Sequence, residues 1–351
     1  MEIKIGQKKV SANAPIFIIA EAGVNHNGSL ATALKLVDAA AAAGVDAIKF
    51  QTFKAEGVVT GNGKMAEYQI KNTGKSESQL AMLKKLELPD DFYRPLIKHC
   101  RKKNIIFLST PHGGFKSVDL LQKLKVPAFK FGSGDLTNLP LLKYAAKFNK
   151  PMILGTGMAT LAEVSEAINT IKKTGNSQII ALHCTTNYPC PEDEVNLRAM
   201  ETMRQKLPAL IGYSDHTSGI LVPIMAAILG ACLIEKHFTL DKNMPGPDHR
   251  ASLEPLELKA MVEIIRQTPI ILGSKIKKPN ASETIMIKTV RKSIVAAKNI
   301  KQGEIFSERN LAIKRPGTGL APKYYYSLLG QFAKKNITTD TLIQKSDYEK
   351  R

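Results

Sequence analysis

Short runs of apolar and β-branched residues recur about every 25–40 residues along most of the chain. Apolar residues at successive positions are typical of strands that a parallel sheet buries on both faces. Helical patterns lie between the runs, as in the Ala-rich stretch 30–44 and in 161–173, which follows the N-cap candidate Thr160. Strand and helix alternating eight times predict a (β/α)8 TIM barrel over roughly residues 14–273. The eight predicted strands are 16–21, 47–53, 104–111, 127–134, 151–157, 179–185, 209–215 and 232–238.

The pattern becomes polar and basic after residue 273, which predicts a domain boundary. We assign 1–273 to the barrel, 274–290 to a linker, and 291–351 to a small domain of short strands and turns. A domain of about 60 residues is near the lower limit of independent stability, so packing on a barrel or a partner subunit would help it. The long polar segment 54–88, after the second strand, is a candidate active-site loop.

The composition excludes several classes of protein. No apolar run reaches the roughly 18–20 residues of a membrane span, and the N-terminus has no apolar secretion signal. We therefore expect no membrane partner. The four cysteines contain no CxxC pair, which predicts a reduced, cytoplasmic protein.

The net charge of +19 is concentrated toward the C-terminus, where residues 274–351 hold 17 Lys and Arg against 6 Asp and Glu. A basic tail can indicate nucleic acid as a partner. The tail has no RGG tract, no zinc-finger spacing and no pattern of stacking aromatics. We therefore expect no nucleic-acid partner, and we attribute the charge to an anionic substrate or to solubility.

Polar side chains fall at the carboxyl ends of the predicted strands, where TIM barrels carry their chemistry. Lys49 and Gln51 share one face of a strand because side chains alternate with a period of two. Lys49 and Lys130 interrupt otherwise apolar runs, and Ser and Thr hydroxyls and Gly-rich turns lie nearby. This combination predicts a site for a phosphate or carboxylate ligand.

His216 and His237 follow neighbouring strands, which lie about 4.8 Å apart in a sheet. Either they are two structural histidines, or they converge on a divalent cation. We favour the metal, and two nitrogen ligands with waters and substrate oxygens suit Mn²⁺, Co²⁺, Ni²⁺ or Zn²⁺. Asp215 either orients His216 or caps a helix, and we favour the cap. Gly155–Gly157 either forms a tight turn or contributes to the site, and this stays open.

Several motifs identify a family resemblance that extends over nearly the whole chain. They are IAEAGVNHNGS, AIKFQTFKAE, FLSTP, FKFGSGD, HCTTNYPCP, GYSDHTSG, EKHFTLDKNMPGPDH and KRPGTG, in this order. The chain resembles the N-acetylneuraminate (sialic acid) synthase family. The resemblance implies a TIM barrel followed by an antifreeze-like (SAF) domain, and a homodimer that exchanges the small domains.

The resemblance also implies a reaction. A transferase of this family condenses phosphoenolpyruvate with an open-chain sugar, typically N-acetylmannosamine, and water. The products are N-acetylneuraminate and phosphate, and the C–O bond of phosphoenolpyruvate is the one that breaks. The metal would be Mn²⁺ first, with Mg²⁺ or Co²⁺ as alternatives.

Matching positions assign the implied site residues to four roles. The catalytic residues are Glu21, Lys49 and Lys130. Phosphoenolpyruvate would be bound by Lys49, Thr110, Lys130, Ser133 and Ser214. The sugar would be bound by Gln51, Asp135, Tyr188, Asp248 and Arg315, the last from the partner subunit's small domain. The metal ligands would be His216 and His237.

The chain departs from the family pattern at three places. Thr186 stands directly after the HCT motif, where some members have Asn. Asp135 is one methylene shorter than the Glu of many members, and His112 replaces a common Phe. Three alternatives remain. One is a legionaminic acid synthase that takes 2,4-diacetamido-2,4,6-trideoxymannose. Another is a metal-dependent barrel aldolase or epimerase without phosphoenolpyruvate. The third is a carbohydrate- or nucleic-acid-binding protein that acts through its basic domain.

Overall fold

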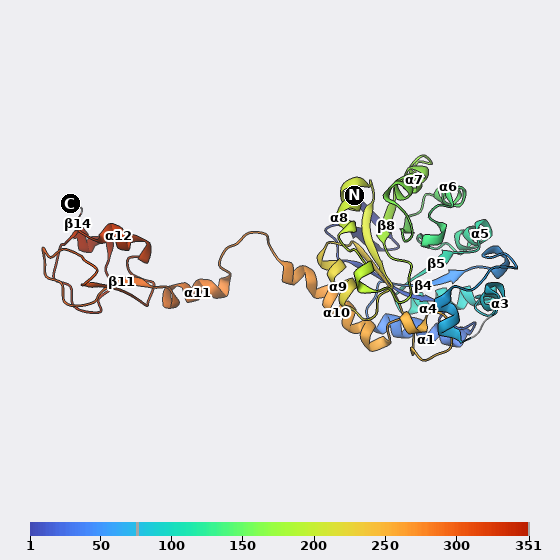
Figure 1. Cartoon of the computed structure of the whole chain (residues 1–351), viewed down its shortest axis with the longest axis horizontal. Coiled ribbons are helices and arrows are strands. Elements are labelled where there is room, and N and C mark those ends of the chain that lie inside the picture. Colours follow the sequence, from blue (N-terminus) through green and yellow to red (C-terminus); the bar gives the residue numbers. More distant parts are fainter. Residues whose placement is uncertain (75–76, 350–351) are drawn as a thin grey trace. The chain divides into compact units, whose positions relative to one another are not determined.

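The computed structural model describes residues 1–74 and 77–349, which form two units, Met1–Gly273 and Ser274–Arg351 (Figure 1). In the first unit the predicted TIM barrel is confirmed. Eight parallel strands pair in the order β5-β4-β3-β10-β9-β8-β7-β6, and β5 and β6 at the two ends of this order are neighbours. The strands are β3 (Phe17–Gly23), β4 (Ala47–Thr52), β5 (Ile106–Pro111), β6 (Phe129–Phe131), β7 (Met152–Gly155), β8 (Ile179–His183), β9 (Leu210–Asp215) and β10 (Leu233–His237).

Helices surround these strands (Figure 1). They are α1 (Leu30–Ala42), α4 (Tyr93–Lys102), α5 (Phe115–Lys123), α6 (Leu139–Ala146), α7 (Leu161–Lys172), α8 (Ala199–Lys206), α9 (Leu221–Ile228) and α10 (Pro255–Leu272). The predicted N-cap of α7 is confirmed. Thr160 Oγ1 accepts a hydrogen bond from the Glu163 amide at 3.3 Å, and the Glu163 carboxylate accepts one from the Thr160 amide at 2.7 Å.

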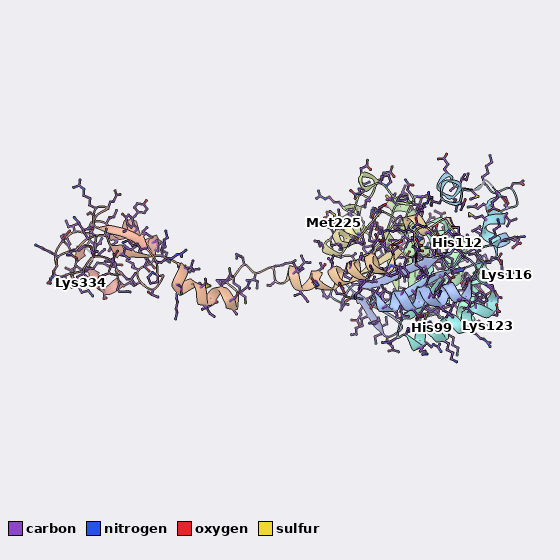
Figure 2. All side chains as sticks on the ribbon, turned by 90° about the horizontal axis from the view of Figure 1, so that it is seen from below. His99, His112, Lys116, Lys123, Met225 and Lys334 are labelled. Carbon is purple, nitrogen blue, oxygen red and sulfur yellow. The ribbon has the colours of Figure 1, made fainter. Side chains whose placement is uncertain are left out.

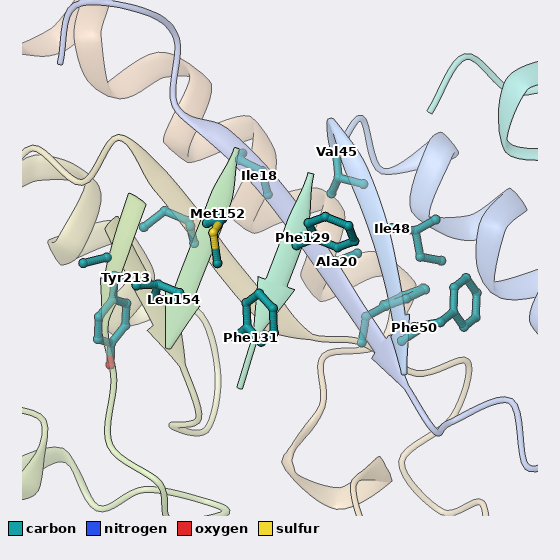
Figure 3. Close-up of a cluster of buried hydrophobic side chains, with 14 of the residues drawn as sticks. Ile18, Ala20, Val45, Ile48, Phe50, Phe129, Phe131, Met152, Leu154 and Tyr213 are labelled. Carbon is teal, nitrogen blue, oxygen red and sulfur yellow. The ribbon is translucent and has the colours of Figure 1, made fainter. Parts of the chain in front are cut away.

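Alternation along the strands divides the apolar side chains between two cores. Ile18, Ile48 and Phe129 point outward and pack against the helices, and Figure 3 shows them with their neighbours in this outer core. Phe17 and Ala47 point inward and belong to a core inside the barrel. The inner core fills the half of the barrel where the strands begin, so the half where they end is free for polar groups.

A hairpin that the sequence analysis missed closes the end of the barrel where the strands begin. It consists of β1 (Glu2–Ile5) and β2 (Lys8–Ser11), which pair antiparallel. Ile3, Ile5 and Val10 are buried and join the inner core. The hairpin escaped prediction because each strand has only four residues, too few for a clear alternating pattern.

The long segment after β4 folds over the other end of the barrel. It contains α2 (Glu67–Thr73) and α3 (Gln79–Lys84). Its apolar side chains form a small core together with Val24 from the turn after β3. They are Phe53, Ala55, Met65, Met82, Leu83 and Leu86. Asn72 Nδ2 donates a hydrogen bond to Pro247 O at 2.7 Å, which ties this segment to the loop after β10.

The second unit has a separate apolar core, centred on Ile294, Phe306 and Ile343. Its elements are α11 (Ala281–Val290), β11 (Ser293–Ala296), β12 (Leu311–Lys314), α12 (Tyr325–Leu328), β13 (Phe332–Ala333) and β14 (Tyr348–Glu349). Helix α11 thus lies within the segment predicted as a linker. In neither described unit is there a helix of the length and hydropathy that a membrane span requires.

The hairpin should stabilise the barrel measurably. Ile5 is fully buried, so we expect Ile5→Ala to lower the free energy of unfolding by roughly 2–4 kcal/mol. Lys4→Ala, on the exposed face of the same strand, is the control and should change it by less than about 0.5 kcal/mol. Urea denaturation of both variants measures the difference. Equal stability of the two would show that the hairpin does not support the barrel.

Candidate active site

A cavity of about 280 Å³ opens at the carboxyl ends of the barrel strands. Most of the predicted site residues line it, although they come from all parts of the barrel sequence. These are Glu21, Lys49, Gln51, Thr110, Lys130, Ser133, Tyr188, Ser214, His216, His237 and Asp248. The structure therefore brings the predicted anion, sugar and metal residues of the barrel into one site.

Four buried charged side chains form the floor of this cavity. Lys49 Nζ lies 2.5 Å from Glu21 Oε2 and 3.8 Å from Glu235 Oε2. Lys130 Nζ lies 2.9 Å from Glu235 Oε1. All four residues are at most 6% exposed. Two carboxylates and two ammonium groups, all buried, thus balance one another, which limits the desolvation penalty of each.

The environment separates the pKa values of the two carboxylates. Burial raises the pKa of Glu21 to about 7, although Lys49 opposes the shift. Burial also acts to raise the pKa of Glu235, but Lys130 and Lys49 outweigh it and lower the pKa to about 2. Glu235 is therefore a fixed negative charge, whereas Glu21 exchanges a proton near neutral pH. Such a pair suits a site in which one carboxylate handles protons.

Hydroxyl and amide groups surround the two lysines. Thr110 Oγ1 accepts a hydrogen bond from Lys49 Nζ at 3.1 Å, and Ser214 Oγ donates one to Glu235 Oε1 at 3.1 Å. The Gly157 amide donates to Ser133 Oγ at 3.0 Å. A Cβ on Gly157 would lie 2.9 Å from that oxygen, so a glycine is needed for this close approach. The glycine turn after β7 thus positions Ser133.

The imidazole rings of His216 and His237 lie close together in the lining of the cavity, with ring centroids 5.4 Å apart. Burial lowers the pKa of His216 to about 4 and the pKa of His237 well below its usual value, so both rings are neutral. His216 Nδ1 donates to Thr185 O at 2.6 Å, which leaves a lone pair on Nε2. Tyr188 packs against both rings, with centroids 4.1 and 5.5 Å away.

This histidine pair fits a metal ion. Neutral imidazoles are the form that binds metal, and His237 Nδ1 is buried with no hydrogen-bond partner among the described residues. No group of three or more His, Cys, Asp or Glu in the described parts of the chain forms a metal cluster. Two protein nitrogens would therefore leave the remaining positions to water or substrate oxygens, as an open site requires.

A second buried ion pair lies directly behind His216. Lys236 Nζ donates to Asp215 and, at 2.5 Å, to Thr217 O. Asp215 also accepts hydrogen bonds from the amide and hydroxyl of Thr217 and from Tyr213 OH. Helix α9 begins only at Leu221, so the helix-cap interpretation of Asp215 is wrong. Asp215 instead holds the backbone amide of Thr217, the residue that follows His216.

Gln51 and Asp248 also line the cavity, close to Glu21. Gln51 Nε2 lies 3.5 Å from Glu21 Oε1, and burial raises the pKa of Asp248 to about 6. Gly23 lies between them with a φ of +51°, and a Cβ there would lie 3.3 Å from Glu21 Oε1. Glycine at position 23 therefore lets the side chains of Glu21, Gln51 and Asp248 approach one another.

Two predicted residues do not line the cavity, and one residue of the site was missed. Asp135 lies just outside the lining, beside His112, and Arg315 belongs to the second unit. Glu235 was not among the predicted site residues. It could have been recognised, because it shares a strand face with His237, two positions on.

The chain matches known proteins along its whole length. Residues 36–277 match the NeuB family, and residues 291–349 match the SAF domain. The N,N'-diacetyllegionaminic acid synthase of Campylobacter jejuni is 53% identical over 93% of this chain and 98% of its own. The N,N'-diacetyllegionaminic acid synthase of Legionella pneumophila is 44% identical over 96% of each. The crystal structure of the Bacillus subtilis spore coat polysaccharide biosynthesis protein SpsE is 40% identical, with a TM-score of 0.68 over the whole of both chains.

The ion pair behind His216 gives a stability prediction. Asp215→Ala would leave the Lys236 ammonium buried without its carboxylate, so we expect the free energy of unfolding to fall by roughly 3–5 kcal/mol. Asp215→Ala combined with Lys236→Met should recover most of this loss. Glu263→Ala, which removes an exposed ion pair with Lys259, is the control and should cost less than about 0.5 kcal/mol. Chemical denaturation measures all three, and a double variant no more stable than Asp215→Ala would contradict the pairing.

Proposed function

The chain belongs to the NeuB family, and from this premise we propose that it synthesises N,N'-diacetyllegionaminic acid. Its substrates would be phosphoenolpyruvate, water and 2,4-diacetamido-2,4,6-trideoxymannose, and phosphate would be released. The expectation of N-acetylmannosamine as the sugar is unconfirmed, and the legionaminic alternative fits the relatives better.

The observation that carries the choice of sugar is the apolar wall of the cavity. The segment after β4 contributes Val58, Met82, Leu83 and Leu86 to the lining, with Val24 beside them. The trideoxy sugar has a methyl group at C6 and an acetamido group at C4, whereas N-acetylmannosamine has hydroxyls at both. Methyl groups gain from contact with such a wall, by about 0.8 kcal/mol per carbon buried, and hydroxyls lose hydration there.

The floor of the cavity supports phosphoenolpyruvate as the second substrate. Lys49 and Lys130 supply two positive charges, and Thr110, Ser133 and Ser214 supply hydroxyls around them. A phosphate and a carboxylate on one small molecule match this donor set. A barrel aldolase or epimerase that takes no such anion has no need of both lysines.

In the proposed reaction, C3 of phosphoenolpyruvate bonds to the aldehyde carbon of the open-chain sugar. Positive charge then develops at C2, where water adds and the C–O bond to phosphate breaks. Glu21 and Glu235 are the carboxylates that would stabilise this charge. Because the pKa of Glu21 is about 7, Glu21 is the residue suited to take the proton of the attacking water.

We propose that His216 and His237 hold a divalent ion, with Mn²⁺ first and Mg²⁺ or Co²⁺ as alternatives. Such an ion supplies Lewis-acid polarisation and a fixed position for the sugar aldehyde. The histidines support this by being neutral, buried and adjacent. Asp215 would keep His216 in place through the backbone that it holds.

We further propose that the protein is a homodimer in which Arg315 reaches the partner's sugar. The support is that Arg315 is exposed in the second unit, directly after β12, within the KRPGTG motif of the resemblance. An exposed guanidinium with five donors is suited to an acetamido carbonyl on a bound sugar.

The direct test measures phosphate release from phosphoenolpyruvate with Mn²⁺ and either sugar. We expect kcat/KM for the 2,4-diacetamido-6-deoxy sugar to exceed that for N-acetylmannosamine by at least about tenfold. A preference for N-acetylmannosamine would make the protein an N-acetylneuraminate synthase instead. Release with neither sugar would overturn the proposed reaction and favour the aldolase or binding alternatives.

The metal proposal has its own test. We expect His237→Ala to lose nearly all bound Mn²⁺, measured by mass spectrometry of the purified protein and by calorimetric titration, and to lose nearly all phosphate release. His99→Ala, which changes a histidine paired with Asp38 on the barrel's helical layer, is the control and should bind Mn²⁺ as the unmodified protein does. Full Mn²⁺ binding by His237→Ala would remove this residue from the metal site.

A further inference from the structure

The loop between β10 and α10 carries Asp248 into the cavity but has little backbone hydrogen bonding of its own. Its base is closed, because the Thr239 amide donates to Leu253 O at 2.9 Å. In its middle, Pro245 and Pro247 have no amide hydrogen to donate. The carbonyl groups of this part of the loop therefore need partners from other segments of the chain.

Asn25, in the turn after β3, supplies partners at two points of the loop. Its side chain is buried, and Nδ2 donates to Phe238 O at 2.9 Å and to Ser252 Oγ at 3.0 Å. Ser252 Oγ then donates to Asp248 O at 2.7 Å. Both hydrogens of the Asn25 amide group are thus used on this one loop. The main chain of Asp248 is thereby tied to the turn after β3 through a single hydroxyl.

Asn27, in the same turn, holds the middle of the loop. Its Nδ2 donates to Pro245 O at 2.9 Å, and its Oδ1 lies 3.3 Å from Nε2 of His249, the residue after Asp248. A Cβ on Gly246 would lie 2.6 Å from the ring of His249, so glycine permits this close approach. Asn27 has a φ of +50°, which asparagine adopts more readily than most residues.

The carboxylate of Asp248 depends on this support from its backbone. Burial alone raises the pKa of Asp248 to about 6, and its carboxylate makes no ion pair or hydrogen bond with any residue that the structure describes. Its own side-chain contacts therefore do not fix its place beside Glu21 and Gln51. The backbone of the loop fixes it, and the two asparagines hold that backbone.

We propose that Asn25 and Asn27 form an asparagine clamp and act as positioning residues, which hold the loop so that Asp248 meets the sugar. This inference rests on the proposed function, in which Asp248 is expected to bind the sugar. Neither asparagine is among the described residues that line the cavity, so both act through the loop. Loss of the clamp should weaken sugar binding and leave the anion site at Lys49 and Lys130 unchanged.

The first test uses Asn27→Gly and Ser252→Ala in the full chain, each of which removes one attachment to the turn after β3. Glycine accepts the φ of position 27, so the backbone of the turn is kept. With the sugar that the unmodified protein prefers, the KM for the sugar should rise at least about fivefold in each variant. The KM for phosphoenolpyruvate should stay within about twofold. An unchanged KM for the sugar would overturn the proposal.

A double variant tests whether the clamp acts through Asp248. Asp248→Ala alone should raise the KM for the sugar at least as much as Asn27→Gly does. Asn27→Gly added to Asp248→Ala should raise it by less than about twofold more, because the group that the clamp positions is then absent. A full second rise of about fivefold would contradict a route through Asp248.

Two controls separate positioning from a general loss of stability. Asn176 is also a buried asparagine, and its Nδ2 donates to Lys150 O at 2.8 Å in the turn before β7. Asn176→Ala should lower the free energy of unfolding but leave both KM values unchanged. Lys123→Ala, at the exposed end of α5 (Figure 2), should change neither quantity. A rise in the KM for the sugar with Asn176→Ala as large as with Asn27→Gly would overturn the specific role of the clamp.

Hydrogen exchange measured by mass spectrometry tests the clamp without any substrate. The amides of residues 239–253 should exchange at least about tenfold faster in Asn27→Gly than in the unmodified protein, and those of β4 should not. Unchanged exchange would overturn the clamp. Faster exchange with an unchanged KM for the sugar would overturn its role in sugar binding. Phosphate release with neither sugar would overturn the proposed function, whereas faster exchange would still support the attachment of the loop.

Discussion

The site depends on the mutual neutralisation of four buried charges. Glu21, Lys49, Glu235 and Lys130 are each too strongly desolvated to persist as an isolated ion. They are stable together because strands β3, β4, β6 and β10 hold them at fixed separations. The packed inner core beneath them and the helices around them keep those strands from shifting. An anion that binds beside these four side chains adds negative charge, and Glu21 can offset that charge by taking up a proton.

The barrel and the convergence of its polar residues could be predicted from the sequence for a geometric reason. Parallel strands of one barrel end at the same rim, so Lys49, Lys130, His216 and His237 had to lie near one another once the strands were located. Alternation then determined which side chains point inward. The same argument would have included Glu235, which was overlooked because a polar residue in an apolar run also suits an ion pair of purely structural value.

Other features depend on tertiary contacts that no local pattern contains. The hairpin of residues 2–11 is stabilised by the packing of Ile5 in the inner core, and its short strands alone do not reveal it. The apolar wall arises because the segment after β4 folds on Phe53 and turns Met82 toward the cavity. The pairing of His112 with Asp135 joins the ends of two strands that share no backbone hydrogen-bonded pairing. Strands thus fix the charged groups of the site, whereas loops shape the apolar wall of the pocket.

The closure of the barrel by the N-terminal hairpin leaves ligands a single route into and out of the site. With one end filled by the hairpin and the inner core, ligands of the described barrel use the opposite rim both to arrive and to depart. An anion held by Lys49 and Lys130 and a molecule held at Gln51 and Asp248 would therefore share this one entrance. In the proposed reaction both substrates and both products would pass the same rim, so a ligand that bound out of turn would delay the other until it left again.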